Sequence, residues 1–258
     1  MGKNDTDIIF SKRIMLRVAY DGTDFVGWQV QPRKRTVEGE LNKALSELTG
    51  EDIIVIGASR TDSGVHAKGN VAVFDTFSTI PGEKFMYAVN TLLPEDVSVV
   101  ESREVPNDFH PRHCDSIKTY EYGIYISNVS NPLKNRYYLR CPYELNVEKM
   151  DEAAKYLVGE HDFKSFCCVR TQAETTVRKI ISADVFKENE DEIIIRVSGA
   201  GFLYNMVRII AGSLMEVGSG KYEPIHIKDV LESTDRTVAG PTAEPQGLTL
   251  VGIEFADL

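Results

Sequence analysis

The segment RIMLRVAY, residues 13–20, opens the pattern that decides the fold of this chain. Ile14, Leu16, Val18 and Tyr20 stand at every second position, and the intervening positions are more polar or smaller. A period of two is typical of a strand with one buried face. The segment therefore predicts a half-buried strand, and the residues that follow it extend the pattern.

A helix and further strands follow this strand in a fixed order. Thr36 is placed to cap a helix that Gly50 ends. The remaining segments are predicted as strands at 52–58 and 70–76, a helix around 85–92, and a strand at 97–105. The first half of the chain thus has the order β-α-β-β-α-β.

The second half repeats this order without sequence identity to the first. Asn146 is placed to cap its first helix. The segments are predicted as strands at 119–126, 177–186, 192–198 and 248–255, with helices from 147, at 202–218 and at 225–233. We therefore predict an α+β fold of two ferredoxin-like halves, residues 1–107 and 108–258, whose antiparallel sheets flank a central active-site cleft.

Composition limits the class of protein. Of 258 residues, 42% are hydrophobic and 26% are charged, which is typical of a globular protein. No apolar run approaches the roughly 18 residues that a membrane helix needs, and we expect no signal peptide. Four cysteines without a C-x-x-C pair predict neither a zinc site nor disulfides, and favour a cytoplasmic location. The net charge of −10 disfavours a general polyanion binder but allows a local basic groove.

The loop around Asp62 allows two interpretations, a solvated turn or a site. It joins two predicted strands, and it is more glycine-rich than a hairpin needs. Arg60, Asp62 and His66 could converge there. We expect Asp62 to stay ionised because a neighbouring guanidinium lowers the pKa of a carboxyl. Such a carboxylate can be a nucleophile, a base or a metal ligand, and the metal is least favoured because no other carboxylate is near.

Two residues of the second half are candidates for the same site. Arg208 lies in an apolar helix and needs a partner there, either locally or across a cleft at Asp62. Tyr120 shares a strand face with Tyr122, which favours either core packing or stacking on a base.

A further basic segment could contact nucleic acid. Trp28 is followed by Arg33, Lys34 and Arg35, which form either a solvated loop or a phosphate contact near an aromatic ring. Further basic residues could extend that surface: Arg136, Arg140, Arg170, Arg178 and Lys179.

Five segments carry a resemblance to the TruA family of tRNA pseudouridine synthases. They occur in the family's order along nearly the whole chain: YDGTDFVGWQVQ (20–31), RTDSGVHAKGNVAVFD (60–75), DFHPRHCDSIKTYEY (108–122), FLYNMVRIIAGSLMEVG (202–218) and EPQGLTLV (244–251). One such segment is modest support, and five in order are strong.

The resemblance implies a role for each site residue. Asp62 corresponds to the nucleophile, and Arg60 belongs to the same signature. Arg208 corresponds to the arginine that pairs with the aspartate, Tyr120 to the tyrosine that packs against the uracil, and Leu248 to an apolar wall of the base pocket.

The resemblance also implies the reaction and the partners. Members are homodimers that bind tRNA, and the usual targets are uridines 38, 39 and 40 of the anticodon stem-loop. The isomerisation moves the ribose bond of uracil from N1 to C5, so we expect no redox cofactor and no metal. Departures from the family pattern, such as Ser59, Ser63 and Asn70, leave the target positions open.

Two other functions remain as alternatives. The first is an RNA-binding module without catalysis, and the second is an aspartate-dependent phosphoryl-transfer enzyme, which would need magnesium.

Overall fold

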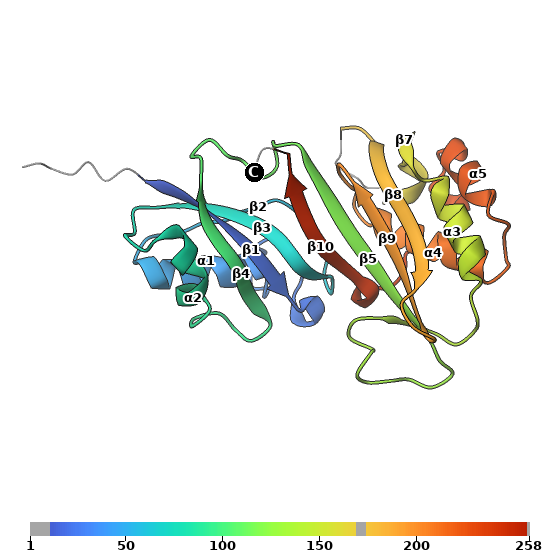
Figure 1. Ribbon diagram of the computed structural model, residues 1–258, viewed down its shortest axis with the longest axis horizontal. Coiled ribbons are helices and arrows are strands. Elements are labelled where there is room, and N and C mark those ends of the chain that lie inside the picture. The colour runs from blue at the N-terminus through green and yellow to red at the C-terminus, as the bar shows by residue number, and fades with distance from the viewer. Residues whose placement is uncertain (1–10, 169–173, 257–258) are drawn as a thin grey trace, which may run out of the picture.

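The computed structural model describes residues 11–168 and 174–256 (Figure 1). The strands are β1 (Lys12–Tyr20), β2 (Ile56–Gly57), β3 (His66–Thr76), β4 (Val97–Val105), β5 (Ser116–Ile126), β6 (Leu139–Cys141), β7 (Gly159–Asp162), β8 (Val177–Lys187), β9 (Glu192–Gly199) and β10 (Leu248–Phe255). The α-helices are α1 (Val37–Thr49), α2 (Phe85–Val89), α3 (Val147–Lys155), α4 (Met206–Gly218) and α5 (His226–Ser233).

The ten strands of the described residues form one sheet rather than the two that the sequence predicted. Its order is β4-β1-β3-β10-β5-β9-β8-β7, with β2 beside β3 and β6 beside β5. Strand β10 joins the halves, because it pairs parallel to β3 and antiparallel to β5 (Figure 1). The last strand of the chain therefore lies at the centre of the sheet, where no repeat pattern in the sequence would place it.

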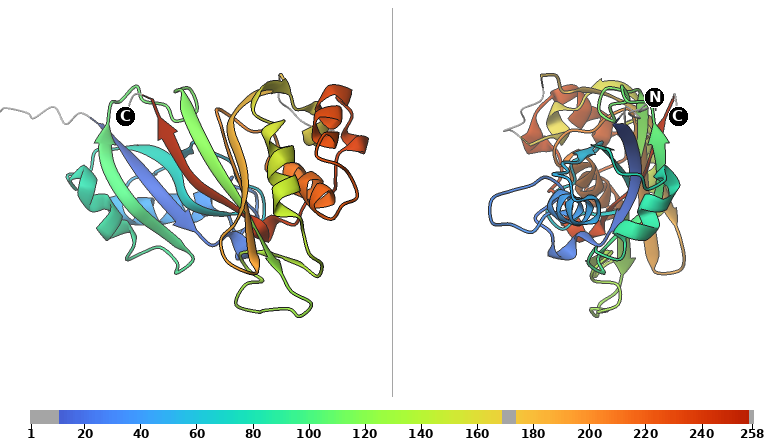
Figure 2. Two further views of the ribbon diagram at one scale, coloured as in Figure 1. Left: turned by 45° about the vertical axis from the view of Figure 1, so that its right-hand side comes forward. Right: turned by 90° about the vertical axis from the view of Figure 1, so that its left-hand side faces the viewer.

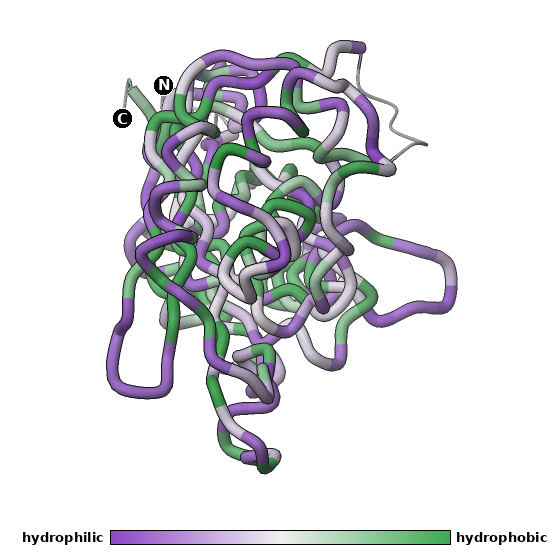
Figure 3. The backbone as a smooth tube through the Cα atoms, turned by 90° about the vertical axis from the view of Figure 1, so that its right-hand side faces the viewer, coloured by the Kyte–Doolittle hydropathy of each residue, from purple (hydrophilic) through white to green (hydrophobic). Residues whose placement is uncertain are grey.

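The helices α1, α3, α4 and α5 lie on the same side of this sheet (Figure 2). Helix α2 contacts β4 and α1. The core between the sheet and these helices is apolar, while the loops that protrude from the body are largely hydrophilic (Figure 3). Burial of that apolar layer is the main stabilising term of such a fold.

The helix boundaries that were predicted from a capping residue in the sequence are confirmed. The Thr36 hydroxyl accepts from the Gly39 amide at the start of α1, and Gly50 ends it in the left-handed region. Asn146 caps α3 through the Lys149 amide. Helix α4 begins later than predicted, because Asn205 has a φ of 62° and interrupts helical geometry.

The strand predicted at 52–58 is reduced to two residues. The amide of Ile53 donates to the Ser46 hydroxyl, and the amide of Val55 donates to the Asn42 side chain. Two side chains of α1 thus take the backbone donors that a longer strand would have paired. The short strands β6 and β7 were not predicted. In the described ranges, no helix has the length and apolarity needed to cross a bilayer.

Candidate active site

A cavity of about 980 Å³ lies on the helix-covered face of the sheet, between the two halves of the chain. Its lining comes from the segment before α1, the loop before β3, strand β5, the start of α4 and the start of β10. The residues that matter below are Trp28, Ser59, Arg60, Asp62, Arg112, Lys118, Tyr120, Phe202, Asn205, Met206 and Leu248. A concave site between two halves is the usual place for ligand binding.

The loop that carries Asp62 is fixed by hydrogen bonds on both sides. The Trp28 amide donates to the carbonyl of Thr61 at 3.1 Å, and the Val65 amide donates to the carbonyl of Asp62 at 3.2 Å. Gly64 takes a φ of 78°, which lets the chain turn sharply after the aspartate. The backbone that carries the carboxylate is therefore fixed by these bonds rather than part of a free turn.

A polar network supports the base of this loop. Asn70 is fully buried, and its amide nitrogen donates to the carbonyl of Ser59 at 3.0 Å and to the Tyr20 hydroxyl at 3.3 Å. The Tyr20 and Thr61 hydroxyls share a hydrogen bond of 2.7 Å. A satisfied buried network of this kind favours one loop position.

Arg208 reaches Asp62 from the second half of the chain. Its guanidinium Nη1 lies 3.9 Å from Asp62 Oδ2. Two other bonds orient it, because Nε donates to the carbonyl of Ala243 at 2.7 Å and Nη1 donates to Asn205 Oδ1 at 2.9 Å. The local partners of Arg208 are a neutral amide and a carbonyl rather than an ion pair, and the carboxylate it approaches is Asp62, across the cleft.

The pKa of Asp62 moves in the direction opposite to the one expected. Burial raises this pKa above its ordinary value, and the charge of Arg208 opposes the rise only in part. The sequence prediction that a neighbouring guanidinium would set the shift was wrong, since the loop sequence gave no measure of burial. The carboxylate is thus less solvated and more basic than an ordinary aspartate.

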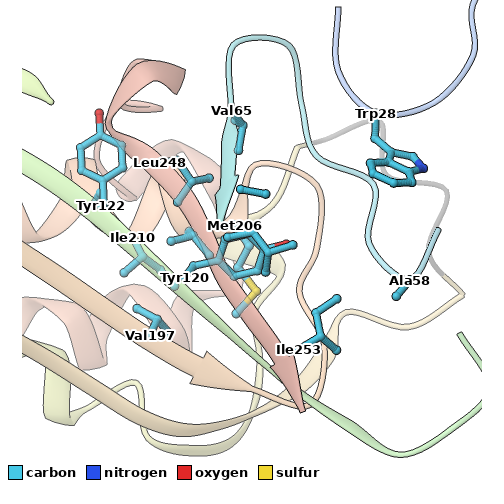
Figure 4. Close-up of a cluster of buried hydrophobic side chains, with 14 of the residues drawn as sticks. Trp28, Ala58, Val65, Tyr120, Tyr122, Val197, Met206, Ile210, Leu248 and Ile253 are labelled. Carbon is cyan, nitrogen blue, oxygen red and sulfur yellow. The ribbon is translucent and has the colours of Figure 1, made fainter. Parts of the chain in front are cut away.

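Tyr120 and Leu248 form apolar walls of the cavity. Both belong to one buried cluster that also contains Met206 (Figure 4). The Tyr120 ring meets Phe202 edge to face at 5.0 Å, and its hydroxyl shares a hydrogen bond of 2.9 Å with Ser59. Burial raises the pKa of Tyr120 to about 12, so its hydroxyl stays protonated at neutral pH.

With this geometry established, the chain was compared with known proteins. The sequence model of the tRNA pseudouridine synthase family matches residues 17–113 and 153–256. The chain belongs to this family. It is 48% identical to tRNA pseudouridine synthase A of Ruminiclostridium cellulolyticum and 45% identical to that of Caldicellulosiruptor bescii, over 95% of this chain and 100% of each relative. It is 46% identical to that of Brevibacillus brevis over 93% of this chain and 98% of the relative.

The family and the class of enzyme predicted from the sequence are confirmed by these matches. The matched ranges contain Arg60, Asp62, Arg208 and Leu248, and the identity to whole relatives also covers the segment between the two ranges.

His66 does not join this site. Its Nδ1 accepts from the Gly22 amide at 3.0 Å, and the ring borders a different cavity on the opposite face of the sheet. Arg60 is exposed and lines the cleft. The predicted convergence of Arg60, Asp62 and His66 therefore holds only for the first two. No group of three or more His, Cys, Asp or Glu residues in the described ranges could hold a metal.

Trp28 and the three basic residues that follow it differ in their exposure to solvent. Trp28 is 0% exposed and packs against Gly57, so its ring does not reach solvent. Arg35 is held by both carboxylate oxygens of Asp96 and by Glu40. Of the three cations in this segment, Arg33 and Lys34 are exposed.

Two of the other basic residues predicted to extend that surface contact groups of the protein itself. Arg136 pairs with Asp24, and Arg178 bonds carbonyls of its own strand segment. Arg170 lies outside the described residues.

Sequence reasoning missed two cations of the cleft, Arg112 and Lys118. Arg112 Nε donates to the carbonyl of Gly57 at 2.7 Å, and Lys118 Nζ donates to the carbonyl of Ala58 at 3.1 Å. The signal was present, because Lys118 stands two positions before Tyr120 and so shares its strand face.

Proposed function

We propose that this enzyme converts uridine to pseudouridine in the anticodon stem-loop of tRNA, at positions 38, 39 and 40, with Asp62 as the nucleophile. One observation carries the proposal. Asp62 is held in a cleft between the halves, 3.9 Å from the guanidinium of Arg208, with a flat aromatic wall at Tyr120. The names of the relatives, tRNA pseudouridine synthase A, support the substrate class.

The reaction breaks the bond between uracil N1 and ribose C1′ and forms a bond between C5 and C1′. A nucleophile can hold one fragment while the other turns, and it is released when the new carbon–carbon bond forms. The C5 proton then leaves to a base and is replaced at N1, so the product is an isomer of the substrate. Asp62 is suited to the first task, because a buried carboxylate is poorly solvated and so more reactive.

The neighbouring residues take roles that follow from their contacts. Arg208 stabilises the carboxylate whenever it carries its charge, in the free enzyme and after release of the product. Tyr120 and Leu248 enclose the flat base between apolar surfaces. With a pKa of about 12, Tyr120 is a poor acceptor for the C5 proton, so we assign it to packing.

The uridine must leave its stack to reach this cavity, at a cost of a few kcal/mol. Exposed cations at the rim can offset that cost through phosphate contacts. Arg60 lines the cavity, and Arg33 and Lys34 are exposed on the segment next to it. We assign the first contacts with RNA to these three residues.

The two halves, residues 1–107 and 108–258, are proposed as ferredoxin-like units. The strand order is β4-β1-β3-β2 in the first half and β10-β5-β9-β8 in the second. In each half the last strand lies beside the first, and the third strand lies between the first and the second, which supports this proposal. We further propose a cytoplasmic homodimer, for which the family resemblance is the support.

Release of tritium from tRNA labelled at uracil C5 tests the proposal. The wild-type enzyme should release tritium in step with pseudouridine formation. Asp62→Asn should lower kcat by more than about 10³-fold, because the amide is no nucleophile. Asp52→Asn, at an exposed carboxylate outside the cleft, is the matched control and should leave kcat unchanged.

Two outcomes would decide against this function. Unchanged turnover by Asp62→Asn would exclude Asp62 as the nucleophile. Tight binding of tRNA by the wild type with no tritium release would favour an RNA-binding module instead. Mapping pseudouridines in tRNA from cells that lack the protein identifies the positions modified.

A further inference from the structure

Two cations of the cleft have no task in the mechanism above. Arg112 and Lys118 each donate to a backbone carbonyl of the catalytic loop, at Gly57 and Ala58 respectively. Both side chains line the same cavity, so the two cationic groups face one site. Each donor group has further N–H bonds to offer, since a guanidinium has five and an ammonium three.

Neither cation has a carboxylate within 4.0 Å among residues 11–168 and 174–256. Elsewhere the sheet pairs its arginines closely, for example Arg13 with Asp75 and Arg196 with Glu121. Asp62 is the one carboxylate among the described residues that line the cavity, and it faces Arg208. Among the described residues, the wall at Arg112 and Lys118 is therefore positive with no carboxylate in direct contact, and Glu38 acts on Arg112 only from beyond ion-pair distance.

The environment of these cations favours an anion between them. Burial lowers the pKa of Lys118, and the neighbouring charge of Arg112 lowers it further. Partial burial lowers the pKa of Arg112 and the charge of Arg60 adds to that effect, while the charge of Glu38 opposes it. Two like charges repel, and an anion between them adds two attractions that outweigh this repulsion.

The position of the pair relative to the base wall indicates which anion fits. Lys118 and Tyr120 are two residues apart on β5, so they share one face of the strand at a separation of about 7 Å. A nucleotide whose base lies against Tyr120 can thus place a backbone phosphate beside Lys118. Lys118 would pair with the negative charge of the phosphate, and the planar guanidinium of Arg112 would donate to two phosphate oxygens.

We propose that Arg112 and Lys118 form a subsite for one backbone phosphate of the RNA strand, next to the target uridine. The inference rests on the proposed function, because it takes the base to lie against Tyr120. Both cations also hold the carbonyls that precede Asp62, at Gly57 and Ala58. The same two side chains therefore contact the catalytic loop and, in this proposal, the nucleotide.

The test combines enzyme variants with RNA in which one phosphate is neutral. Stem-loop substrates carry a single methylphosphonate on either side of the target uridine, and Lys118→Met and Arg112→Met remove the cations. On natural RNA, each variant should lower kcat/KM by about 10- to 100-fold, mainly through KM, as expected for a lost charge-assisted hydrogen bond. The dependence of log KM on log salt concentration should lose about one unit of slope.

The deciding result is non-additivity. At one of the two methylphosphonate positions, Lys118→Met should cause little further loss, because the contact is already gone. Lys118→Arg should recover most of the lost KM effect. Lys43→Met, at an exposed lysine of α1, should leave both KM and the salt slope unchanged. Circular dichroism melting of each variant establishes that it is folded.

Three results would overturn the subsite. If the loss from Lys118→Met and the loss from the methylphosphonate multiply fully at both positions, Lys118 contacts neither phosphate. A loss in Lys43→Met as large as in Lys118→Met would assign the effect to general charge. Binding of inorganic phosphate with no coupling to either methylphosphonate would assign the pair to free phosphate. If the wild type releases no C5 tritium, the proposed function itself fails, and that result is distinct from these three.

Discussion

The two faces of the sheet carry cavities with opposite charge. The cleft on the helix-covered face has one carboxylate, Asp62, and three lining cations, Arg60, Arg112 and Lys118. A cavity of about 500 Å³ on the other face is lined by Asp21, Glu95, Asp96, Glu121 and Glu188, with Lys68 as its one lysine or arginine among the described residues. Tyr120 and Glu121 belong to different cavities because consecutive residues of a strand point to opposite faces.

The two cavities differ in how their charges are satisfied. On the acidic face, burial alone would raise the pKa of Asp21, but hydrogen bonds from Thr23 and Tyr137 lower it overall. Glu121 behaves in the same way through Arg196 and Lys68. In the cleft, the pKa of Asp62 stays raised. Charges that are fully paired stabilise the fold, whereas charges left incompletely paired are available to a substrate.

The largest effect expected from this contrast follows removal of Arg208. Arg208→Met should lower kcat/KM by about 100-fold at neutral pH, a loss typical of removing one charged group from a reacting centre. Because the charge of Arg208 lowers the pKa of Asp62, its removal raises that pKa further. The acid limb of the profile of kcat/KM against pH, where Asp62 becomes protonated, should therefore move to higher pH.

Arg208→Lys separates the charge from the structural bonds of this side chain. It keeps a cation near Asp62 but loses the paired contacts with Ala243 and Asn205. Its acid limb should lie close to that of the wild type. An acid limb that stays in place in Arg208→Met would show that the contact across the cleft does not act on Asp62.

An intermediate effect is expected at the wall of the cleft. Tyr120→Phe keeps the ring and its contact with Phe202 but loses the hydrogen bond to Ser59. If packing is the role of Tyr120, kcat should fall by less than about tenfold. A general base would instead contribute about 10²- to 10⁴-fold. Steady-state tritium release measures kcat, with Tyr87→Phe on the exposed side of α2 as the control.

A loss of more than 100-fold in kcat for Tyr120→Phe, with KM unchanged, would contradict the packing role. The hydroxyl would then be needed for proton transfer despite its pKa of about 12.

Much of this site was predictable from the sequence because it lies in local motifs. The caps at Thr36 and Asn146 fixed two helices, and the family segments indicated Asp62, Tyr120, Arg208 and Leu248 before any geometry was known. Local patterns record which residue types are present and how they alternate. They are sufficient for a helix cap, because a cap depends on the residue's immediate neighbours.

The sequence predictions that failed depend on contacts between residues that are far apart in the chain. The pKa of Asp62 depends on burial by residues from both halves, and the central place of β10 depends on pairing between strands far apart in sequence. Trp28 resembled an exposed aromatic beside basic residues, but its ring packs on Gly57. Such facts depend on tertiary contacts, which periodicity does not contain.

The smallest effect on activity is expected on the acidic face, at Glu121. Glu121 Oε1 accepts from Arg196 Nε at 2.9 Å and from Nη2 at 2.6 Å, and Oε2 accepts from Lys68 at 3.2 Å. Because the folded-state pKa of Glu121 is lowered, its contribution to stability is present above the unfolded value of about 4.3 and is lost as pH falls through the folded value. Glu121→Gln should therefore be less stable than the wild type at pH 7, by about 0.5–1 kcal/mol. This difference should shrink on acidification.

Urea unfolding at pH 7 and at pH 4 measures that difference, and Glu95→Gln is the control because Glu95 is exposed and forms no ion pair among the described residues. The kcat/KM of Glu121→Gln should stay within about twofold of the wild type, since surface substitutions away from a site rarely reach it. Glu121 adjoins Tyr120 in the chain, so this variant is a severe test of the separation between the faces. A tenfold loss of kcat/KM would show that the pairing on the acidic face positions Tyr120, and the two cavities would then form one functional unit through β5.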